Sequence, residues 1–323
     1  MEELKDKKVL VTGGAGFIGS HIVDKLSELG ASVTVLDNLT TGKKENIGDD
    51  LDKIKFIEKS LTDDSALEEA LEGVDMVCHQ AALLKVPESI DKPLDYHQVN
   101  TTGTLKLFLK AKEKGVKKIV LASSSSVYGD CVDFPEKETD STQPLSPYAV
   151  TKLMGEHYAS LFSKFHGIDI VSLRYFNVFG PRQSLENKYA VVIPKFIVSL
   201  LGEDSPPIYG DGKQERDFIY IDNVVDANIL ALTKDKIGGQ VFNIAGGNAE
   251  SINNLFQTVQ ELTAKSQGPK YLEPRPGDVR KTLADITKAK ELLGWQPKVG
   301  FKKGLEKTVE WFRNYTESKW QEY

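Results

Sequence analysis

The sequence predicts an α/β protein built around a doubly wound parallel sheet, followed by a second, smaller α/β lobe. Two observations predict this fold class. Apolar runs of strand length alternate with amphipathic helical segments from Val9 to Leu173, which is typical of a parallel sheet covered by helices on both faces. A glycine-rich turn also separates the first apolar run from the first helical segment, where such sheets bind nucleotides.

The first unit runs from Val9 to Asp37. Its predicted elements are a strand, a helix and a second strand, over 9–11, 18–29 and 33–36. Gly13, Gly16 and Gly19 stand between the first strand and the helix. Glycines at this spacing let the chain turn sharply, let backbone N–H groups approach a pyrophosphate, and let the helix lie close to the sheet. The unit therefore predicts a Rossmann fold that binds a dinucleotide.

Asp37 ends the second strand and indicates which dinucleotide is bound. A carboxylate at this position accepts hydrogen bonds from the adenosine ribose hydroxyls and repels a 2′-phosphate. The expected cofactor is therefore NAD rather than NADP.

The following elements continue the alternation. Further strands are predicted over 54–57, 74–79, 118–122 and 168–173, and helices over 65–71, 95–114 and 147–165. Pro147 suits the first turn of the last helix, because the N–H that proline lacks would have no helical acceptor there. The order predicts parallel strands joined by right-handed crossovers, with ligands bound at their carboxyl ends.

After Arg174 the pattern changes, because glycines and prolines interrupt shorter elements. We assign 1–175 to an NAD-binding domain and 176–323 to a lobe that binds the substrate, and we expect the segment 214–245 to return to the first domain. Helices in this half are predicted over 191–201, 222–233, 251–265 and 301–317.

The composition narrows the classes of partner. The chain has 323 residues, with 41 basic and 47 acidic side chains and a net charge of −6, which gives no general attraction to nucleic acid or to an anionic membrane. Two cysteines are too few for a disulfide framework or a cysteine metal cluster, so no metal is expected, and Cys78 is expected in the core. The amino terminus lacks an apolar signal segment, and no apolar run reaches membrane-spanning length. We expect a cytoplasmic enzyme.

Tyr148 and Lys152 are four residues apart in a predicted helix, so their side chains share one face. A free phenol has a pKa of about 10 and is a weak base at neutral pH. A neighbouring ammonium favours the phenolate and lowers that pKa, which suits Tyr148 to general acid and base catalysis. A serine of the run 123–126, at the end of a predicted strand, would complete the site by donating to a substrate oxygen.

Five segments together carry a family resemblance. They are TGGAGFIGS (12–20), SSSSVYG (123–129), SPYAVTK (146–152), LRYFNVFGPRQ (173–183) and RPGDVRKTLAD (275–285). They resemble the extended short-chain dehydrogenase/reductase family, and within it the UDP-sugar 4-epimerases that act on UDP-glucose/galactose or UDP-N-acetylglucosamine. By this resemblance Ser124 is the catalytic serine, Tyr148 the acid and base, and Lys152 its partner.

The resemblance implies a reaction that inverts carbon 4 of the sugar. Tyr148 takes the O4 proton while the C4 hydride passes to NAD⁺, the 4-keto sugar turns its other face, and hydride and proton return. The implied NAD contacts are Gly13, Gly16, Phe17, Ile18, Gly19, Asp37, Asn38, Ala81, Asn100, Tyr148 and Lys152. His79, at the end of a strand, is expected to be a packing or cofactor-side residue rather than a base.

The implied contacts with the UDP-sugar extend into the second lobe. They are Ser124, Ser125, Tyr175, Asn177, Tyr209, Arg216, Arg275, Asp278 and Thr282. Arg216 and Arg275 would clamp the diphosphate near Asn177, and Tyr209 would stack on uracil. Thr282 would lie beside the C2 substituent, where a small side chain admits an N-acetyl group. The expected substrates are UDP-GlcNAc and UDP-GalNAc and/or UDP-Glc and UDP-Gal.

The residues after Ser124 separate branches of the family. Related 4,6-dehydratases carry Asp-Glu there and UDP-glucuronate decarboxylases tend to carry a glutamate, whereas this chain has Ser125 and Ser126. A hydroxyl cannot do the acid–base work of a carboxylate near neutral pH, which favours an epimerase. A dehydratase, a decarboxylase and a non-catalytic NAD-binding protein stay as alternatives. By analogy with relatives, the helices over 95–114 and 147–165 would form a homodimer contact.

Overall fold

The computed structural model describes residues 2–48, 53–184, 192–274 and 279–319. Within these residues the main sheet has seven parallel strands in the order β10-β6-β5-β4-β1-β2-β3. The strands are β1 Lys8–Thr12, β2 Ser32–Leu36, β3 Lys55–Ile57, β4 Met76–His79, β5 Lys118–Ser124, β6 Asp169–Tyr175 and β10 Val241–Ile244. The strand order reverses between β1 and β4, so the prediction of a doubly wound parallel sheet is confirmed.

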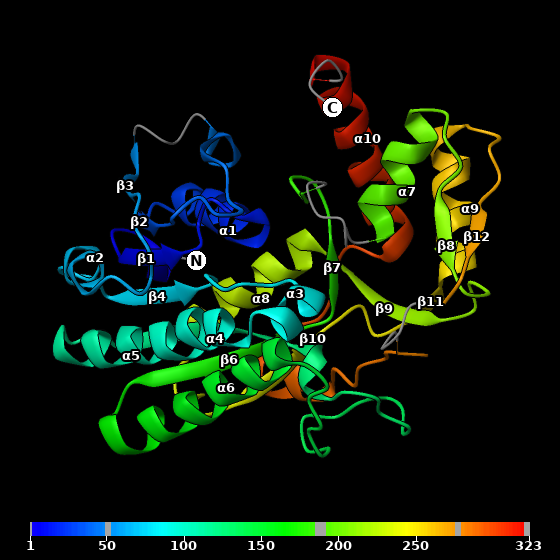
Figure 1. Cartoon of the computed structure of the whole chain (residues 1–323). Coiled ribbons are helices and arrows are strands. Elements are labelled where there is room, and N and C mark those ends of the chain that lie inside the picture. The colour runs from blue at the N-terminus through cyan, green and yellow to red at the C-terminus, as the bar shows by residue number, and fades with distance from the viewer. Residues whose placement is uncertain (1, 49–52, 185–191, 275–278, 320–323) are drawn as a thin grey trace.

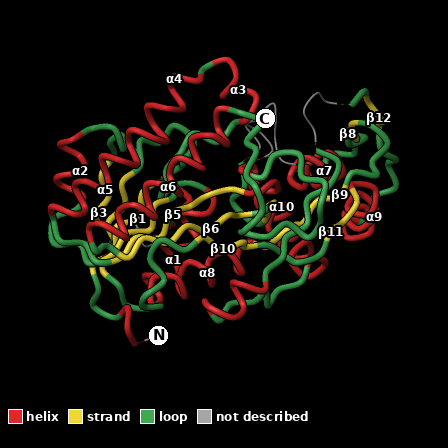
Figure 2. The backbone as a smooth tube through the Cα atoms, turned by 90° about the horizontal axis from the view of Figure 1, so that it is seen from below, coloured by secondary structure: helices red, strands yellow, loops and turns green. Residues whose placement is uncertain are grey.

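Helices cover both faces of this sheet (Figure 2). On one face lie α2 Asp64–Ala70, α4 Pro93–Tyr96, α5 Thr104–Glu113 and α6 Pro147–His166, and on the other α1 Phe17–Glu28 and α8 Ile221–Thr233. The side chains of β1 alternate between the two cores, since Val9 and Val11 pack with α1 whereas Leu10 packs with α2 and α5. Burial on both faces explains why these strands read as continuous apolar runs. Cys78 is fully buried in this core, as expected.

The other strands among the described residues form two small sheets, which lie with the helices α7, α9 and α10 in the second half of the chain (Figure 1). The elements are β7 Asn177–Phe179, β9 Glu215–Tyr220 and β11 Ala249–Ser251, the parallel pair β8 Pro207–Tyr209 and β12 Lys270–Leu272, and the helices α7 Val192–Leu201, α9 Ile252–Thr263 and α10 Phe301–Lys319. Figure 1 shows most of them gathered on one side of the molecule, away from β1 to β3. Phe179 and Phe218 pack against Phe301, which joins β7 and β9 to α10.

The segment 214–245 contributes to both parts of the molecule. Its β10 pairs in parallel with β6, and its helix α8 packs against α1 on the main sheet. Its β9, in contrast, lies in the three-stranded sheet between β11 and β7. The boundary near residue 175 therefore does not coincide with a boundary between the sheets, and the division into two domains stays a prediction.

The helix predicted over 95–114 is more complex than its periodicity indicates. A separate helix, α3 Val86–Asp91, precedes it, and α4 and α5 are joined by a π-helical segment, His97–Gly103. Such segments are frequent at functional sites, and this one carries Asn100. Shorter helical turns cover Glu2–Leu4, Lys44–Asn46, Ser125–Val127 and Ala289–Leu293. Among the described residues, no helix combines the length and apolarity needed to cross a bilayer.

Helix α6 begins and ends at residues whose chemistry explains its bounds. Ser146 is its N-cap, and its hydroxyl accepts a hydrogen bond from the Ala149 N–H. Pro147 occupies the first helical position, as predicted. Gly167 ends the helix with φ of 68°, in the left-handed region that glycine adopts without strain. These local signals place Tyr148 in the first turn, beside the end of β5.

Candidate active site

The glycine turn between β1 and α1 has no room for side chains at two of its predicted positions. Gly13 has φ of +69°, and a Cβ there would lie 2.7 Å from the backbone nitrogen of Ala81. A Cβ on Gly19 would collide with the carbonyl oxygen of Gly13. Gly16 is the N-cap of α1 and has no side chain that could cap it, so the N–H groups of the first turn can bind an anion. Phe17 opens that turn.

Asp37 lies just after β2 and faces this turn. Its Oδ2 accepts from the Ala15 N–H at 3.0 Å, and its Oδ1 accepts from the Leu39 N–H at 2.8 Å. Burial raises the pKa of the Asp37 carboxyl, and these two hydrogen bonds oppose that shift. Each oxygen keeps lone-pair capacity for a ribose hydroxyl. The side-chain oxygen of Asn38, the next residue, accepts from the Thr40 N–H and hydroxyl and so shapes the loop.

Ser124, Tyr148 and Lys152 come together at the carboxyl end of β5. Ser124 is the last residue of that strand, and its hydroxyl forms a hydrogen bond with the Tyr148 side chain. The Lys152 Nζ donates to the Ala122 carbonyl at 2.8 Å and lies 6.0 Å from the centre of the Tyr148 ring. Both Tyr148 and Lys152 are buried. Ser125 follows in a short helical turn, where its carbonyl accepts from the Tyr128 N–H.

Burial acts on the two titratable groups in opposite directions. It raises the pKa of Tyr148, while the hydrogen bond with Ser124 lowers it. It lowers the pKa of Lys152 to about 8, while the Glu156 carboxylate raises it. The direction for Tyr148 differs from the one expected from a neighbouring ammonium alone, because the cost of burying a phenolate outweighs the favourable interactions of the side chain.

Glu156 and Arg174 form a buried ion pair that the sequence analysis did not identify. The Arg174 Nε and a terminal nitrogen donate to the two Glu156 oxygens at 2.9 and 2.7 Å, and each side chain is 4% exposed. The Ser123 hydroxyl donates to the same carboxylate at 2.5 Å. The pair therefore ties α6 to β5 and β6 one helical turn beyond Lys152. The signal for this pair in the sequence is that Glu156 follows Lys152 by four residues, which places both side chains on one face of the helix.

Ala81 lies against the glycine turn, and Asn100 holds the segment that follows Ala81. The Asn100 side chain accepts from the Leu83 N–H at 2.8 Å and donates to the Leu83 carbonyl at 3.0 Å. The Ala81 N–H donates to the Thr12 hydroxyl at 3.2 Å. Both residues fix the backbone after β4, at the carboxyl edge of the sheet where the cofactor is expected.

Tyr175 occupies a different position from the other candidates. Its side chain lies in the core on the α8 face of the sheet, and its hydroxyl donates to the Asn228 side chain at 2.9 Å and contacts Gln80. Tyr148 approaches from α6 on the opposite face. A substrate contact from Tyr175 would therefore involve its backbone, which ends β6 beside Ser124.

Asn177 and Thr282 are neighbours although they are far apart in the sequence. The Asn177 amide donates to the Thr282 hydroxyl and to the Asp217 carbonyl, both at 3.1 Å. The Asp217 N–H also donates to the Thr282 hydroxyl at 3.1 Å. Asp217 is fully buried, and burial raises its pKa to about 7 while backbone N–H groups of Gly246 and Ala284 bind its carboxylate. These contacts fix the segment that carries Thr282.

Two further substrate candidates lie on strands of the second lobe. Tyr209 ends β8, its carbonyl accepts from the Gln214 side chain at 2.8 Å, and the Lys195 ammonium lies 5.9 Å from its ring centre. Arg216 lies on β9 and donates to the Glu215 carbonyl at 2.8 Å. Arg275 and Asp278 lie outside the described residues.

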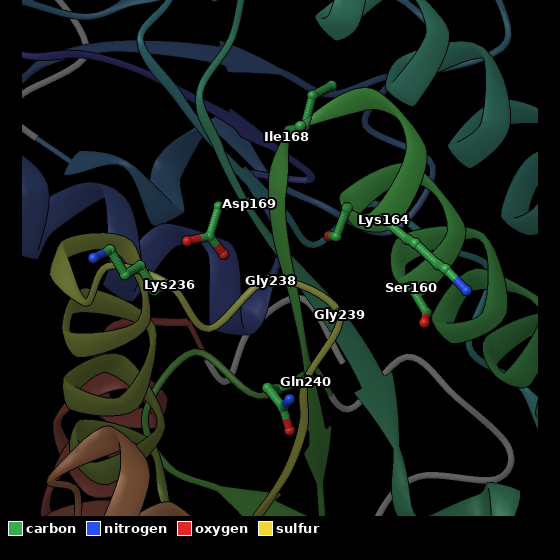
Figure 3. Close-up of a pocket in the computed structure, with 10 residues that line it drawn as sticks. Ser160, Lys164, Ile168, Asp169, Lys236, Gly238, Gly239 and Gln240 are labelled. Carbon is green, nitrogen blue, oxygen red and sulfur yellow. The ribbon is translucent and has the colours of Figure 1, made fainter.

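An open hollow of about 440 Å³ lies at the other edge of the sheet (Figure 3). Ser160 and Lys164 border it from α6, and Gly238 and Gly239 border it from the segment before β10. Asp169 is the first residue of β6, so the hollow opens at the amino edge. The candidate catalytic residues lie at the carboxyl edge, where parallel sheets bind ligands. The hollow is therefore not part of the candidate active site.

Comparison with known proteins gives the site a family context. The model of the NAD dependent epimerase/dehydratase family matches residues 9–245. A putative UDP-glucose 4-epimerase of Methanocaldococcus jannaschii is 40% identical over 95% of this chain and 98% of its own length. A UDP-N-acetyl-alpha-D-glucosaminuronate decarboxylase of Bacillus cytotoxicus is 36% identical over 95% of this chain and 98% of its own. A solved UDP-N-acetylglucosamine 4-epimerase from Methanobrevibacter ruminantium, in complex with UDP-N-acetylmuramic acid, superposes with a TM-score of 0.92, 44% identity and coverage of 96% and 99%.

Proposed function

The chain belongs to the NAD-dependent epimerase/dehydratase family, and from that premise we propose that it is a UDP-hexose 4-epimerase. The observation that carries this proposal is the meeting of Ser124, Tyr148 and Lys152 at the end of β5, with hydroxyls rather than carboxylates at the next two positions. This set can move one proton at a sugar oxygen. It lacks the acid and base that an elimination needs at those positions.

The residues around the glycine turn fit NAD, the cofactor of the family. A Cβ at Gly13 would lie 2.7 Å from the backbone nitrogen of Ala81, and a Cβ at Gly19 would overlap the Gly13 carbonyl, so the turn has no room for a side chain at either position. The first turn of α1 offers N–H groups to a pyrophosphate, and Asp37 offers carboxylate oxygens to a ribose. Bound NAD would supply the hydride acceptor and donor for carbon 4.

The proposed work of this chain is proton transfer and orientation. The Ser124 hydroxyl donates a hydrogen bond to the O4 oxygen. Tyr148, which the Lys152 ammonium and the positive charge of bound NAD⁺ would together keep ionised against the cost of burial, takes the O4 proton as carbon 4 becomes a ketone. Tyr148 holds the proton while the sugar turns and returns it to the same oxygen, so one base serves both faces. The Lys152 ammonium stabilises the phenolate, and burial keeps water away from the ketone.

The proposed substrates are UDP-GlcNAc and UDP-GalNAc, with or without UDP-Glc and UDP-Gal. Thr282 has a small side chain, and its position is held by hydrogen bonds from Asn177 and Asp217. A tyrosine there would occupy the volume that an N-acetyl group needs. In this proposal Asn177, Arg216 and Arg275 bind the diphosphate, Tyr209 and Asp278 bind the uridine, and Ser125 and the Tyr175 backbone border the sugar.

Product analysis tests this proposal. Purified protein is incubated separately with each of the four UDP-hexoses, and the products are separated and identified by their molecular masses. We expect an isomer of equal mass with no net NADH. A product lighter by water would replace the epimerase with a dehydratase. Loss of carbon dioxide from UDP-glucuronate, offered as a fifth substrate, would replace it with a decarboxylase. Thr282→Tyr should lose the N-acetyl substrates first, and turnover of only the plain pair by the unmodified enzyme would contradict the substrate proposal.

We also propose a homodimer through the helices around α6. Large apolar side chains are exposed there, including Leu94 at 81% and Phe165 at 66%. Val150, Leu161 and Phe165 are spaced so that they share one face of α6. Exposed apolar patches of this kind favour a protein contact, and a two-fold dimer would bury the same face of both subunits.

A further inference from the structure

His79 is buried at the end of β4 with both ring nitrogens in hydrogen bonds. Its Nδ1 lies 2.7 Å from the Thr12 hydroxyl of β1, and its Nε2 lies 2.8 Å from the Thr104 hydroxyl of α5. The exposed fractions are 0% for Thr12, 2% for His79 and 3% for Thr104. Water therefore does not compete for these groups, and each proton has a fixed place.

The direction of every bond follows by elimination. The Thr104 hydroxyl donates its one proton to the Asn100 carbonyl at 2.6 Å, so its oxygen accepts from the His79 Nε2–H. The Thr12 oxygen accepts from the Ala81 N–H, and its own proton is left for Nδ1. The imidazole is therefore neutral, with its proton on Nε2. Burial and the nearby Lys152 charge lower the pKa of His79 to about 3, in agreement with this form.

The chain of hydrogen bonds continues from Asn100 to the catalytic helix. The Asn100 amide donates to the Thr151 hydroxyl at 3.1 Å, and Thr151 donates to the Tyr148 carbonyl at 2.7 Å. Asn100 and Thr151 are buried as well. A continuous polar chain thus connects the strand that carries the glycine turn with the first turn of α6.

We propose that His79 is a positioning residue, whose Nε2–H tautomer fixes the glycine turn relative to Tyr148 through Thr12, Thr104, Asn100 and Thr151. The inference rests on the proposed function for its kinetic consequence only. Proton and hydride transfer require Tyr148 and the cofactor held at the glycine turn to be correctly placed relative to each other, and a misplacement of about 1 Å can cost about 100-fold in rate. A residue that only filled the core would stabilise the fold without affecting this relative position.

The tautomer is tested directly by nuclear magnetic resonance on protein labelled with ¹⁵N-histidine. The chain has five histidines, and the His79 signals are those that His79→Gln removes. We expect a protonated Nε2 and an unprotonated Nδ1, unchanged from about pH 5.5 to about pH 8.5, a range in which ordinary histidines titrate. A proton on Nδ1, or titration in that range, would overturn the proposal. This measurement needs no enzymatic turnover, so it stands apart from the proposed reaction.

The positioning role is tested at Thr104. Thr104→Val keeps the shape but removes the acceptor of Nε2–H, and we expect kcat to fall at least about 10-fold with KM within about threefold. Thr104→Ser restores the hydroxyl and should restore kcat. Thr101→Val is the matched control, because this buried hydroxyl contacts the Met154 sulfur instead. Equal kcat in both valine variants would overturn the role. If the enzyme proves inactive on UDP-sugars, the dissociation constant of NAD replaces kcat and should rise in Thr104→Val alone.

Discussion

Tyr148 and Lys152 illustrate how burial sets the chemistry of single residues. Burial disfavours the ionised form of each, so it raises the pKa of the phenol and lowers that of the ammonium. Ser124 and Glu156 oppose these shifts, one by a hydrogen bond and the other by its charge. The pKa values of the two groups therefore depend on a balance between desolvation and the hydrogen bonds and charges of a few neighbouring side chains. Changes in those side chains should shift the pH dependence or the rate of the reaction measurably.

Tyr148→Phe tests the acid–base role. The variant removes the oxygen that takes the proton, and we expect kcat to fall by about 10² to 10⁴-fold. The amount of bound NAD should stay the same, since the glycine turn is unchanged. Tyr158→Phe, at a partly buried tyrosine of the same helix, is the control and should keep its activity. A kcat for Tyr148→Phe within about threefold of the unmodified enzyme would refute the role.

Glu156→Gln tests the charge state of Lys152. Lys152 loses its proton as the pH rises through about 8, so kcat should fall on the alkaline side of that pH. The Glu156 carboxylate raises the pKa of Lys152, so its removal should move the alkaline limb to lower pH.

The pH profile of kcat is the measurement, with circular dichroism to establish that the variant is folded. This check is needed because Arg174 loses its charged partner. Glu113→Gln, at a carboxylate paired with Lys110 on the surface, should leave the profile unchanged. An alkaline limb that stays in place or moves to higher pH in Glu156→Gln would contradict the assignment.

At the scale of elements, the glycine turn and α6 hold the two halves of the site. The turn depends on close backbone approach, since Gly19 lies against Gly13 and Gly13 lies against Ala81. Helix α6 presents Tyr148, Lys152 and Glu156 at intervals of four residues toward β5 and β6. Both devices are local in sequence, which is why the motifs that encode them can be read directly.

Gly19→Ala tests the close approach within the turn. The new Cβ would overlap the Gly13 carbonyl, so the backbone must move. We expect the free energy of unfolding to fall by about 2 kcal/mol or more and the retained NAD to decrease. Urea unfolding and the NAD content of the purified protein measure the two effects. Gly268→Ala is the control, because its Cβ would meet nothing within 4 Å. Equal stability and NAD content in the two variants would show that the turn tolerates a side chain.

At the scale of the whole molecule, the exposed apolar face of α6 predicts the assembly. Leu161 and Phe165 are 49% and 66% exposed, and a double change of both to lysine should place charges in the dimer contact. We expect the unmodified protein to sediment as a dimer and the variant as a monomer. Val132→Lys is the control, because that side chain is 84% exposed but lies in a loop. A monomeric unmodified protein would reject the dimer.

The sequence predicted the first half of the fold more completely than the second. Strands buried on both faces produce long apolar runs, and the alternation of β1 to β6 with helices predicts the parallel, doubly wound sheet that these strands form. The strands β7, β8, β11 and β12 have three residues each, too few to show a period, and none was predicted. The π-helical segment around Asn100 was also missed, because the apolar spacing on either side of it is that of an ordinary helix.

The sequence by itself determined the cofactor turn, the candidate pair Tyr148 and Lys152, and the parallel sheet, because each depends on neighbours within one or two elements. Only the tertiary structure decided that His79 joins β1 to α5, that Glu156 pairs with Arg174, and that Asn177 meets Thr282. Those contacts join residues 18 to 105 positions apart. Their physical origin is the need of buried polar groups for partners, which a folded chain draws from whichever elements lie nearest in space.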